Sequence, residues 1–154
     1  MAFREKILWS SLAITLGVWG WYFAGFVGAL RAGRFDQGAA TSAFIQAVVL
    51  IVVIQVVAAI VIAITTGRDA GAPADDREKA FALEAYRPAY IVLSVCVVTL
   101  MSSGAVLLRI ANEWHPAPPP GMAPILLANA LLASLVLAQL THSGWQIARF
   151  RMGS

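Results

Sequence analysis

Charge is scarce in this sequence, and cysteine is nearly absent. Asp, Glu, Lys and Arg make up 12% of the 154 residues, against about 25% in ordinary soluble domains. Hydrophobic residues make up 60%, which is more apolar surface than a soluble core of this length can hide, so lipid must cover the excess. The single cysteine, Cys96, excludes an intramolecular disulfide, a four-cysteine zinc site and redox chemistry that depends on cysteine pairs.

The charges also lack the arrangements that several functions require. The basic residues are spread over every loop rather than gathered on one face, so no nucleic-acid partner is predicted. All eight acidic residues fall in loops or at helix ends, whereas a proton-coupled exporter needs a carboxylate within the membrane. The sequence therefore argues against that class of transporter.

Four long apolar runs predict an all-α membrane protein, a four-transmembrane-helix bundle that forms one domain. The expected spans are about 7–30, 43–66, 76–110 and 124–148. The first run is longer than the hydrophobic region of a signal peptide, about 7–15 residues, so we expect it to be retained as a helix. The second run is rich in Val and Ile, but a lone strand in lipid would leave its backbone unpaired, which favours a helix.

The basic residues set the expected orientation. Four spans place both termini and the connection at 65–88 on one side of the membrane, with eight basic residues there and three on the other side. Basic residues in short loops favour the cytoplasmic side. We therefore expect a multi-pass protein of the cell inner (cytoplasmic) membrane with both termini in the cytoplasm.

The densest group of charges lies between the second and third apolar runs. Asp75 and Glu78 have the spacing of a capping box, which predicts that the third helix begins in water near Asp76. Glu84 and Arg87 are three residues apart and can pair on the helix surface. Pro88 removes one backbone hydrogen bond, so it either bends the helix or breaks it.

Small and polar residues indicate how the helices pack. Gly20, Ala24 and Gly28 recur every four residues in the first span. They form a stripe that permits the close approach of a helix, from the same chain or from a second copy. Gln55 lies near the middle of the second span, and we expect it to bond to a neighbouring helix.

Two further helix starts carry local signals. Thr41 and Ser42 offer side-chain oxygens that can cap the second helix. Pro124 suits the first position of the fourth helix, where the missing N–H would have no partner.

The fourth span becomes polar toward its end. Gln139, His142, Ser143 and Gln146 fall on one face, and Asn129 lies near the same stripe. A membrane cytochrome usually holds haem between two histidines on different helices, so His142 could serve only if a second copy supplied the other ligand. We interpret His142 as an interfacial residue, and we predict no cofactor and no metal site.

The run Asp75-Asp76-Arg77-Glu78 before an apolar helix resembles the D-E-R-E signature of small four-span prokaryotic membrane proteins of unknown function. Those proteins continue with an arginine and an aromatic residue, and their last span carries an early asparagine, a late glutamine and an aromatic-Arg-x-Gly ending. The matching residues are Arg87, Tyr90, Asn129, Gln146, Phe150, Arg151 and Gly153. Asp76 departs from the signature, which has glutamate there. In some of these families, the gene lies next to a gene for a helix-turn-helix regulator. The resemblance therefore implies a cytoplasmic protein partner, and it supplies no catalytic mechanism.

Our leading hypothesis is a non-enzymatic integral membrane protein that anchors or regulates a cytoplasmic partner or acts as an accessory subunit. The alternative is a small ion channel or transporter with a polar path along the second and fourth helices. Besides the lipid bilayer, the candidate partners are a second copy, forming a homodimer, and a cytoplasmic protein. The candidate ligand- or partner-binding residues are Asp75, Asp76, Arg77, Glu78, Glu84, Arg87, Gln139, His142 and Gln146.

Overall fold

Four long helices make up the part of the chain that the computed structural model describes, residues 3–66, 76–113 and 121–152. They are α1 (Phe3–Arg31), α2 (Gln37–Thr66), α3 (Asp76–Glu113) and α4 (Met122–Met152). Their lengths are 29, 30, 38 and 31 residues. At about 1.5 Å per residue, each exceeds the roughly 30 Å hydrocarbon core of a bilayer. Each also contains a stretch apolar enough to cross a membrane, which confirms the predicted four-helix membrane fold.

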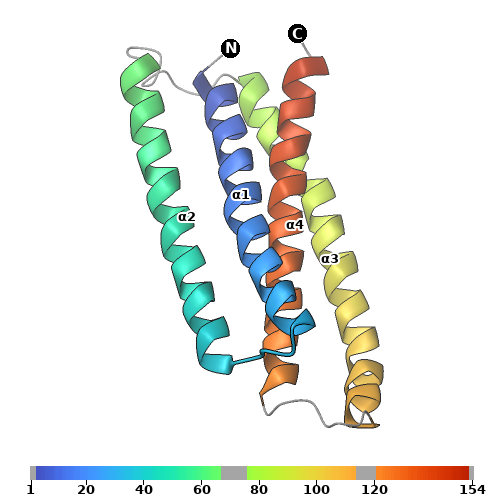
Figure 1. Ribbon diagram of the computed structural model, residues 1–154. Helices are drawn as coiled ribbons and strands as arrows, with labels where there is room; N and C mark the ends of the chain where they lie inside the picture. Colours follow the sequence, from blue (N-terminus) through green and yellow to red (C-terminus); the bar gives the residue numbers. More distant parts are fainter. Residues whose placement is uncertain (1–2, 67–75, 114–120, 153–154) are drawn as a thin grey trace.

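The helices stand side by side in the order α2, α1, α4, α3 (Figure 1). α1 packs against α2 on one side and α4 on the other, while α3 packs against α4. Both chain ends lie at the same end of the molecule as the finish of α2 and the start of α3 (Figure 1). This end, with Lys6, residues 76–87 and residues 149–151, is called the charged end below.

The core forms where the two inner helices meet α2. Its buried residues come from α1, α2 and α4 and are Val18, Trp19, Tyr22, Ala47 and Val136. Ala47 is fully buried because its small side chain lets the backbone of α2 approach the aromatic side chains of α1. The ring of Phe44, one turn before Ala47, stacks on Trp19 with centroids 6.4 Å apart.

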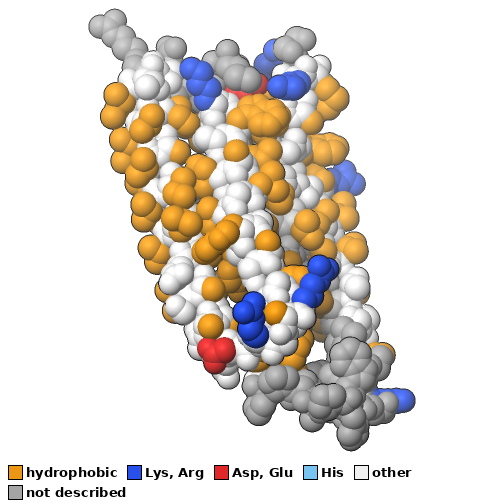
Figure 2. All heavy atoms as spheres, in the orientation of Figure 1, with side chains coloured by type: hydrophobic (Ala, Val, Ile, Leu, Met, Phe, Trp, Pro, Cys, Tyr) orange, Lys and Arg blue, Asp and Glu red, His pale blue; other side chains and the backbone are white. Residues whose placement is uncertain are grey.

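The outward surface is apolar over most of its height. On α2, Val49, Val53 and Val57 are 56%, 52% and 53% exposed. Keeping such side chains in water rather than in an apolar medium would cost about 1.5–3 kcal/mol for each one fully exposed. Figure 2 shows hydrophobic side chains along the middle of the molecule and most Lys and Arg side chains near its two ends. The chain is therefore a multi-pass membrane protein, with lipid as the solvent of this surface.

α2 begins earlier than predicted, and a different residue caps it. The helix starts at Gln37 rather than near residue 43. The backbone N–H of Ala39 donates to Asp36 Oδ2 at 2.6 Å, the geometry of an N-cap. The prediction of Thr41 or Ser42 as the cap is wrong, because the short Gly-Ala-Ala segment before them is already helical and carries no hydrophobic periodicity to reveal it.

The other helix starts lie closer to expectation. α3 begins at Asp76, as predicted, and continues through Pro88. The predicted capping box cannot be compared, since Asp75 lies outside the described residues. α4 begins at Met122, so Pro124 is not its first residue. Pro124 still falls within the first turn, where its missing N–H removes no helical hydrogen bond.

The glycine stripe of α1 faces outward. Gly20, Ala24 and Gly28 are all exposed, and a Cβ built on Gly20 or Gly28 would meet no atom within 4 Å. Of the two alternatives that the stripe permits, packing against another helix of the same chain is therefore wrong. Trp19 and Tyr22 on the other face of α1 provide the intramolecular contact, because their rings supply far more contact area than glycine does.

Candidate functional site

α3 crosses α4 near the charged end (Figure 1), and contacts of Phe81, Glu84 and Tyr86 with α4 place this part of α3 at the crossing. Two alanines of α3 are buried there. Ala85 is completely buried and Ala89 is 8% exposed. Residues four apart lie on one helical face, and side chains this small let two backbones come close together. This pair was not predicted from the sequence, although small residues four apart are the same signal as the glycine stripe of α1.

The crossing joins the charges of α3 to the last turns of α4. Glu84 pairs with Arg149, with 2.7 Å between Oε2 and Nη2. The Arg149 guanidinium also lies 5.5 Å from the centroid of the Phe81 ring, which packs edge-on against Phe150. The predicted pairing of Glu84 with Arg87 is wrong, because the crossing brings Arg149 next to the Glu84 carboxylate. Both partners are partly exposed, so the pair contributes about 0–1 kcal/mol.

α1 is also joined to the charged residues at this crossing. The Arg151 guanidinium lies 5.3 Å from the centroid of the Trp9 ring, which connects α4 to α1. In the first turn of α3, Lys79 Nζ lies 2.9 Å from Asp76 Oδ1, with both side chains exposed. Arg77 is exposed and Glu78 is half-buried on the same turn. Four predicted site residues thus belong to one surface built by α1, α3 and α4, namely Asp76, Arg77, Glu78 and Glu84.

A groove runs between α3 and α4 below this surface. Its volume is about 660 Å³, and the α3/α4 groove is lined by Tyr86, Arg87, Ala89, Tyr90, Leu93, Ala138, Gln139 and His142. Three residues predicted as site residues, Arg87, Gln139 and His142, meet here. Tyr86 and Tyr90 were not predicted as site residues. The sequence signal that could have identified them is their spacing of four residues, which places both tyrosines on one helical face close to Arg87.

His142 has partners from both helices. Its ring centroid is 4.6 Å from that of Tyr86 on α3, and the Gln146 amide nitrogen lies 3.1 Å from its Nε2 and 3.3 Å from its Nδ1. Gln146 is buried, as is Ser143, whereas Gln139 is exposed. The predicted single polar face of α4 is therefore divided between the helix interface and the groove.

Two further polar side chains of the spans, Asn129 and Gln55, bond to α1. The Tyr22 hydroxyl donates to Asn129 Oδ1 at 2.7 Å. Gln55 Nε2 donates to Thr15 Oγ1 at 3.5 Å, so the prediction that Gln55 bonds to a neighbouring helix is confirmed. α1 lies between α2 and α4 (Figure 1), so these two side chains bond to α1 from opposite sides.

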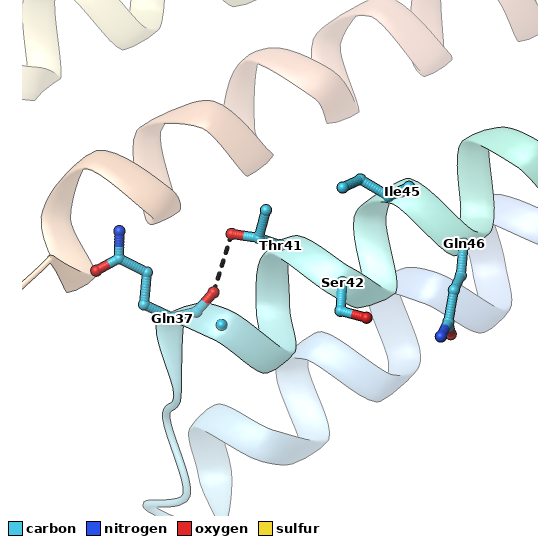
Figure 3. A pocket seen from close by; sticks show the side chains of 6 residues that line it. Gln37, Thr41, Ser42, Ile45 and Gln46 are labelled. Carbon is cyan, nitrogen blue, oxygen red and sulfur yellow. Dashed lines mark hydrogen bonds between the residues drawn. The ribbon is translucent and has the colours of Figure 1, made fainter.

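A second hollow of about 660 Å³ lies along the start of α2, far from the charged end. Its lining comes from α2 alone and consists of Gln37, Gly38, Thr41, Ser42, Ile45 and Gln46. The Thr41 hydroxyl is already used, because it donates to the Gln37 carbonyl at 2.9 Å. Gln37 and Gln46 point in different directions (Figure 3). These side chains do not converge on a common point, and none of them is charged.

Among the described residues, no three His, Cys, Asp or Glu side chains lie close enough together to hold a metal ion. Comparisons of the chain with protein-family models, with curated proteins and with solved structures gave no match. The function is therefore inferred from geometry, burial and charge.

Proposed function

We propose that this protein is a non-enzymatic integral membrane protein whose charged end binds a partner protein, as an anchor or an accessory subunit. The observation that carries the proposal is a mixed-charge surface held across three helices. Glu84–Arg149 joins α3 to α4, and Arg151–Trp9 joins α4 to α1. Side chains that are already held in place lose less conformational freedom on binding than free ones do.

The same surface offers groups that a protein partner can recognise. Asp76, Arg77 and Lys79 are exposed and present both signs of charge, which favours specificity and association rate. Leu83 is 71% exposed among them and provides an apolar contact of the kind that anchors interfaces. Aromatic and arginine side chains, here Phe81 and Arg149, are also enriched in such interfaces.

The distribution of basic residues supports a cytoplasmic location for this surface. Eight basic residues fall on the side of the charged end and three on the other side, the bias that places short loops in the cytoplasm. The partner is then a cytoplasmic protein and the membrane the cell inner membrane. The resemblance to the D-E-R-E membrane proteins, which implies a cytoplasmic protein partner, supports the same proposal.

The alternative, a channel or transporter with a polar path along α2 and α4, has less support. Gln55 is engaged with Thr15, and Asn129 is engaged with Tyr22 and with the carbonyl of Ile125. Ion flux into liposomes, compared between wild type and Gln55→Leu, separates the two functions. Flux that the substitution abolishes would favour the channel.

The partner-binding proposal is tested by affinity purification from native membranes. We expect a protein that co-purifies with the wild type to be lost from the Asp76→Ala/Glu78→Ala variant. The matched control is Arg31→Gln/Arg34→Gln, which removes two charges at the opposite end and should retain that protein. An unchanged set of co-purifying proteins in both variants would contradict the proposal.

A further inference from the structure

The α3/α4 groove is polar at one end and apolar at the other. α3 runs away from the charged end, so Arg87 lies nearer that end than Leu93, by about 9 Å at 1.5 Å per residue. α4 runs toward the charged end, so His142 lies nearer to it than Ala138. The polar part therefore lies at the membrane surface and the apolar part extends toward the membrane centre, as an amphiphile in the bilayer does.

The groove carries one net positive charge. Arg87 is the only charged residue among the described residues that line it. Arg87 is exposed and forms no ion pair within the described part of the chain, whereas Glu84, one turn earlier, is paired with Arg149. An arginine at the edge of an apolar span requires water or an anion around its guanidinium.

Neutral polar groups and aromatic rings surround this charge. Tyr86 and Tyr90 are 63% and 71% exposed along the α3 side of the groove, and Gln139 is exposed on the α4 side. Tyrosine is well suited to the headgroup level, because its ring contacts hydrocarbon while its hydroxyl bonds to polar atoms. His142 of α4 packs on Tyr86 of α3, so these two residues connect the two walls of the groove.

We propose that the α3/α4 groove binds one anionic phospholipid. The lipid phosphate contacts the Arg87 guanidinium, Tyr86 and Gln139 donate to headgroup oxygens, and an acyl chain lies over Tyr90, Leu93 and Ala138. Basic pockets between membrane helices recognise anionic headgroups in this way. The groove volume, about 660 Å³, falls within the range of roughly 300–1,000 Å³ usual for small-molecule sites. This site includes Tyr86 and Arg87 at the edge of the charged end, but the proposal does not depend on a protein partner binding there.

Native mass spectrometry of the purified protein in neutral detergent tests the proposal. Phosphatidylglycerol and phosphatidylcholine with identical acyl chains are added in parallel, and the fraction of protein that retains one lipid is measured. We expect wild type to retain phosphatidylglycerol about tenfold more than phosphatidylcholine, since one charge-assisted contact distinguishes the two lipids. Arg87→Gln should bring this ratio close to one.

Three further measurements make the result specific. Lys79→Gln removes the same charge at the same end but outside the groove, and it should keep the preference. Tyr90→Ala, at an exposed position, should lower the retention of both lipids without changing their ratio. Glycerol phosphate at the same concentration should not displace phosphatidylglycerol.

Equal retention of the two lipids by wild type, or a preference that survives Arg87→Gln, would overturn the proposal. A preference lost equally in Lys79→Gln would show general attraction to the charged end and would overturn it as well. Displacement by glycerol phosphate would identify free phosphate as the ligand instead of a lipid. Lipid retention unchanged by Tyr90→Ala would refute the placement of the acyl chain.

Discussion

The Tyr22 hydroxyl of α1 donates a 2.7 Å hydrogen bond to Asn129 Oδ1 of α4, across 107 residues of sequence. Both side chains are buried, and the Asn129 amide nitrogen donates to the Ile125 carbonyl at 2.9 Å. A polar group in the hydrocarbon region has no water to bond to, so each of these groups depends on its partner in the protein. The bond therefore sets how the two inner helices are aligned.

Tyr22→Phe removes this bond while keeping the ring in place. We expect the free energy of unfolding to fall by about 0.6–1.7 kcal/mol, the range for hydrogen bonds between membrane helices. Unfolding in mixed micelles with increasing sodium dodecyl sulfate measures it. Tyr90→Phe, whose hydroxyl lies on an exposed residue, serves as the control and should change little. Equal losses in the two variants would contradict the assigned role of Tyr22.

Ala85→Leu tests the crossing of α3 and α4. Ala85 is completely buried, so a larger side chain must push the helices apart, at a cost of about 1–3 kcal/mol. Ala80→Leu makes the same change at an exposed position of α3 and should be nearly neutral. Stability is measured in the same mixed micelles, and comparable effects at the two positions would refute the close crossing.

Substitution of two glycines outside the helices should lower stability because of their backbone conformation. Gly33 and Gly121 have φ of 64° and 82°, and an L-residue in this region costs about 1–2 kcal/mol. An added Cβ at Gly121 would lie 2.6 Å from Gln37 Oε1, but that atom ends a flexible side chain and can move away. Gly33→Ala and Gly121→Ala should therefore lose similar stability.

Gly104→Ala is the matched control for these turn glycines. Gly104 lies within α3, and a Cβ there would meet nothing within 4 Å. Alanine is the better helix former by about 1 kcal/mol, so this variant should unfold at equal or higher temperature than wild type. Thermal unfolding followed by circular dichroism compares all three variants. Stabilisation by Gly121→Ala would contradict the positive φ.

The outward glycine stripe of α1 predicts self-association through a second copy. Gly20→Leu/Gly28→Leu should leave the helix content unchanged, since the added side chains meet open space within the chain. The same variant should reduce energy transfer between differently labelled copies in liposomes, because larger side chains keep two helices apart. Ala59→Leu on exposed α2 should have no effect. Energy transfer that survives in the glycine variant would rule out this surface.

Length and hydrophobicity were sufficient to predict the four spans, and the spacing of Asp75 and Glu78 predicted the start of α3 near Asp76. Gln55 could also be interpreted correctly, since an amide in the middle of a span must find a bonding partner. The pairs Glu84–Arg149 and Tyr22–Asn129 could not be predicted, because they depend on which helices become neighbours. For a related reason, it could not be predicted whether the glycine stripe of α1 faces outward or faces another helix of the chain. Periodicity identifies a helical face, but lipid and a neighbouring helix are both apolar, so composition does not separate them.

The central claim is that the charged end lies in the cytoplasm. Labelling of single cysteines in intact cells tests it most directly. In a Cys96→Ser background, Lys79→Cys and Met152→Cys mark the charged end, and Arg34→Cys marks the opposite end. A membrane-impermeant maleimide should label the Arg34 site in intact cells and should reach the other two only after permeabilisation. Labelling of the Lys79 or Met152 site in intact cells would contradict the four-span arrangement with both termini in the cytoplasm.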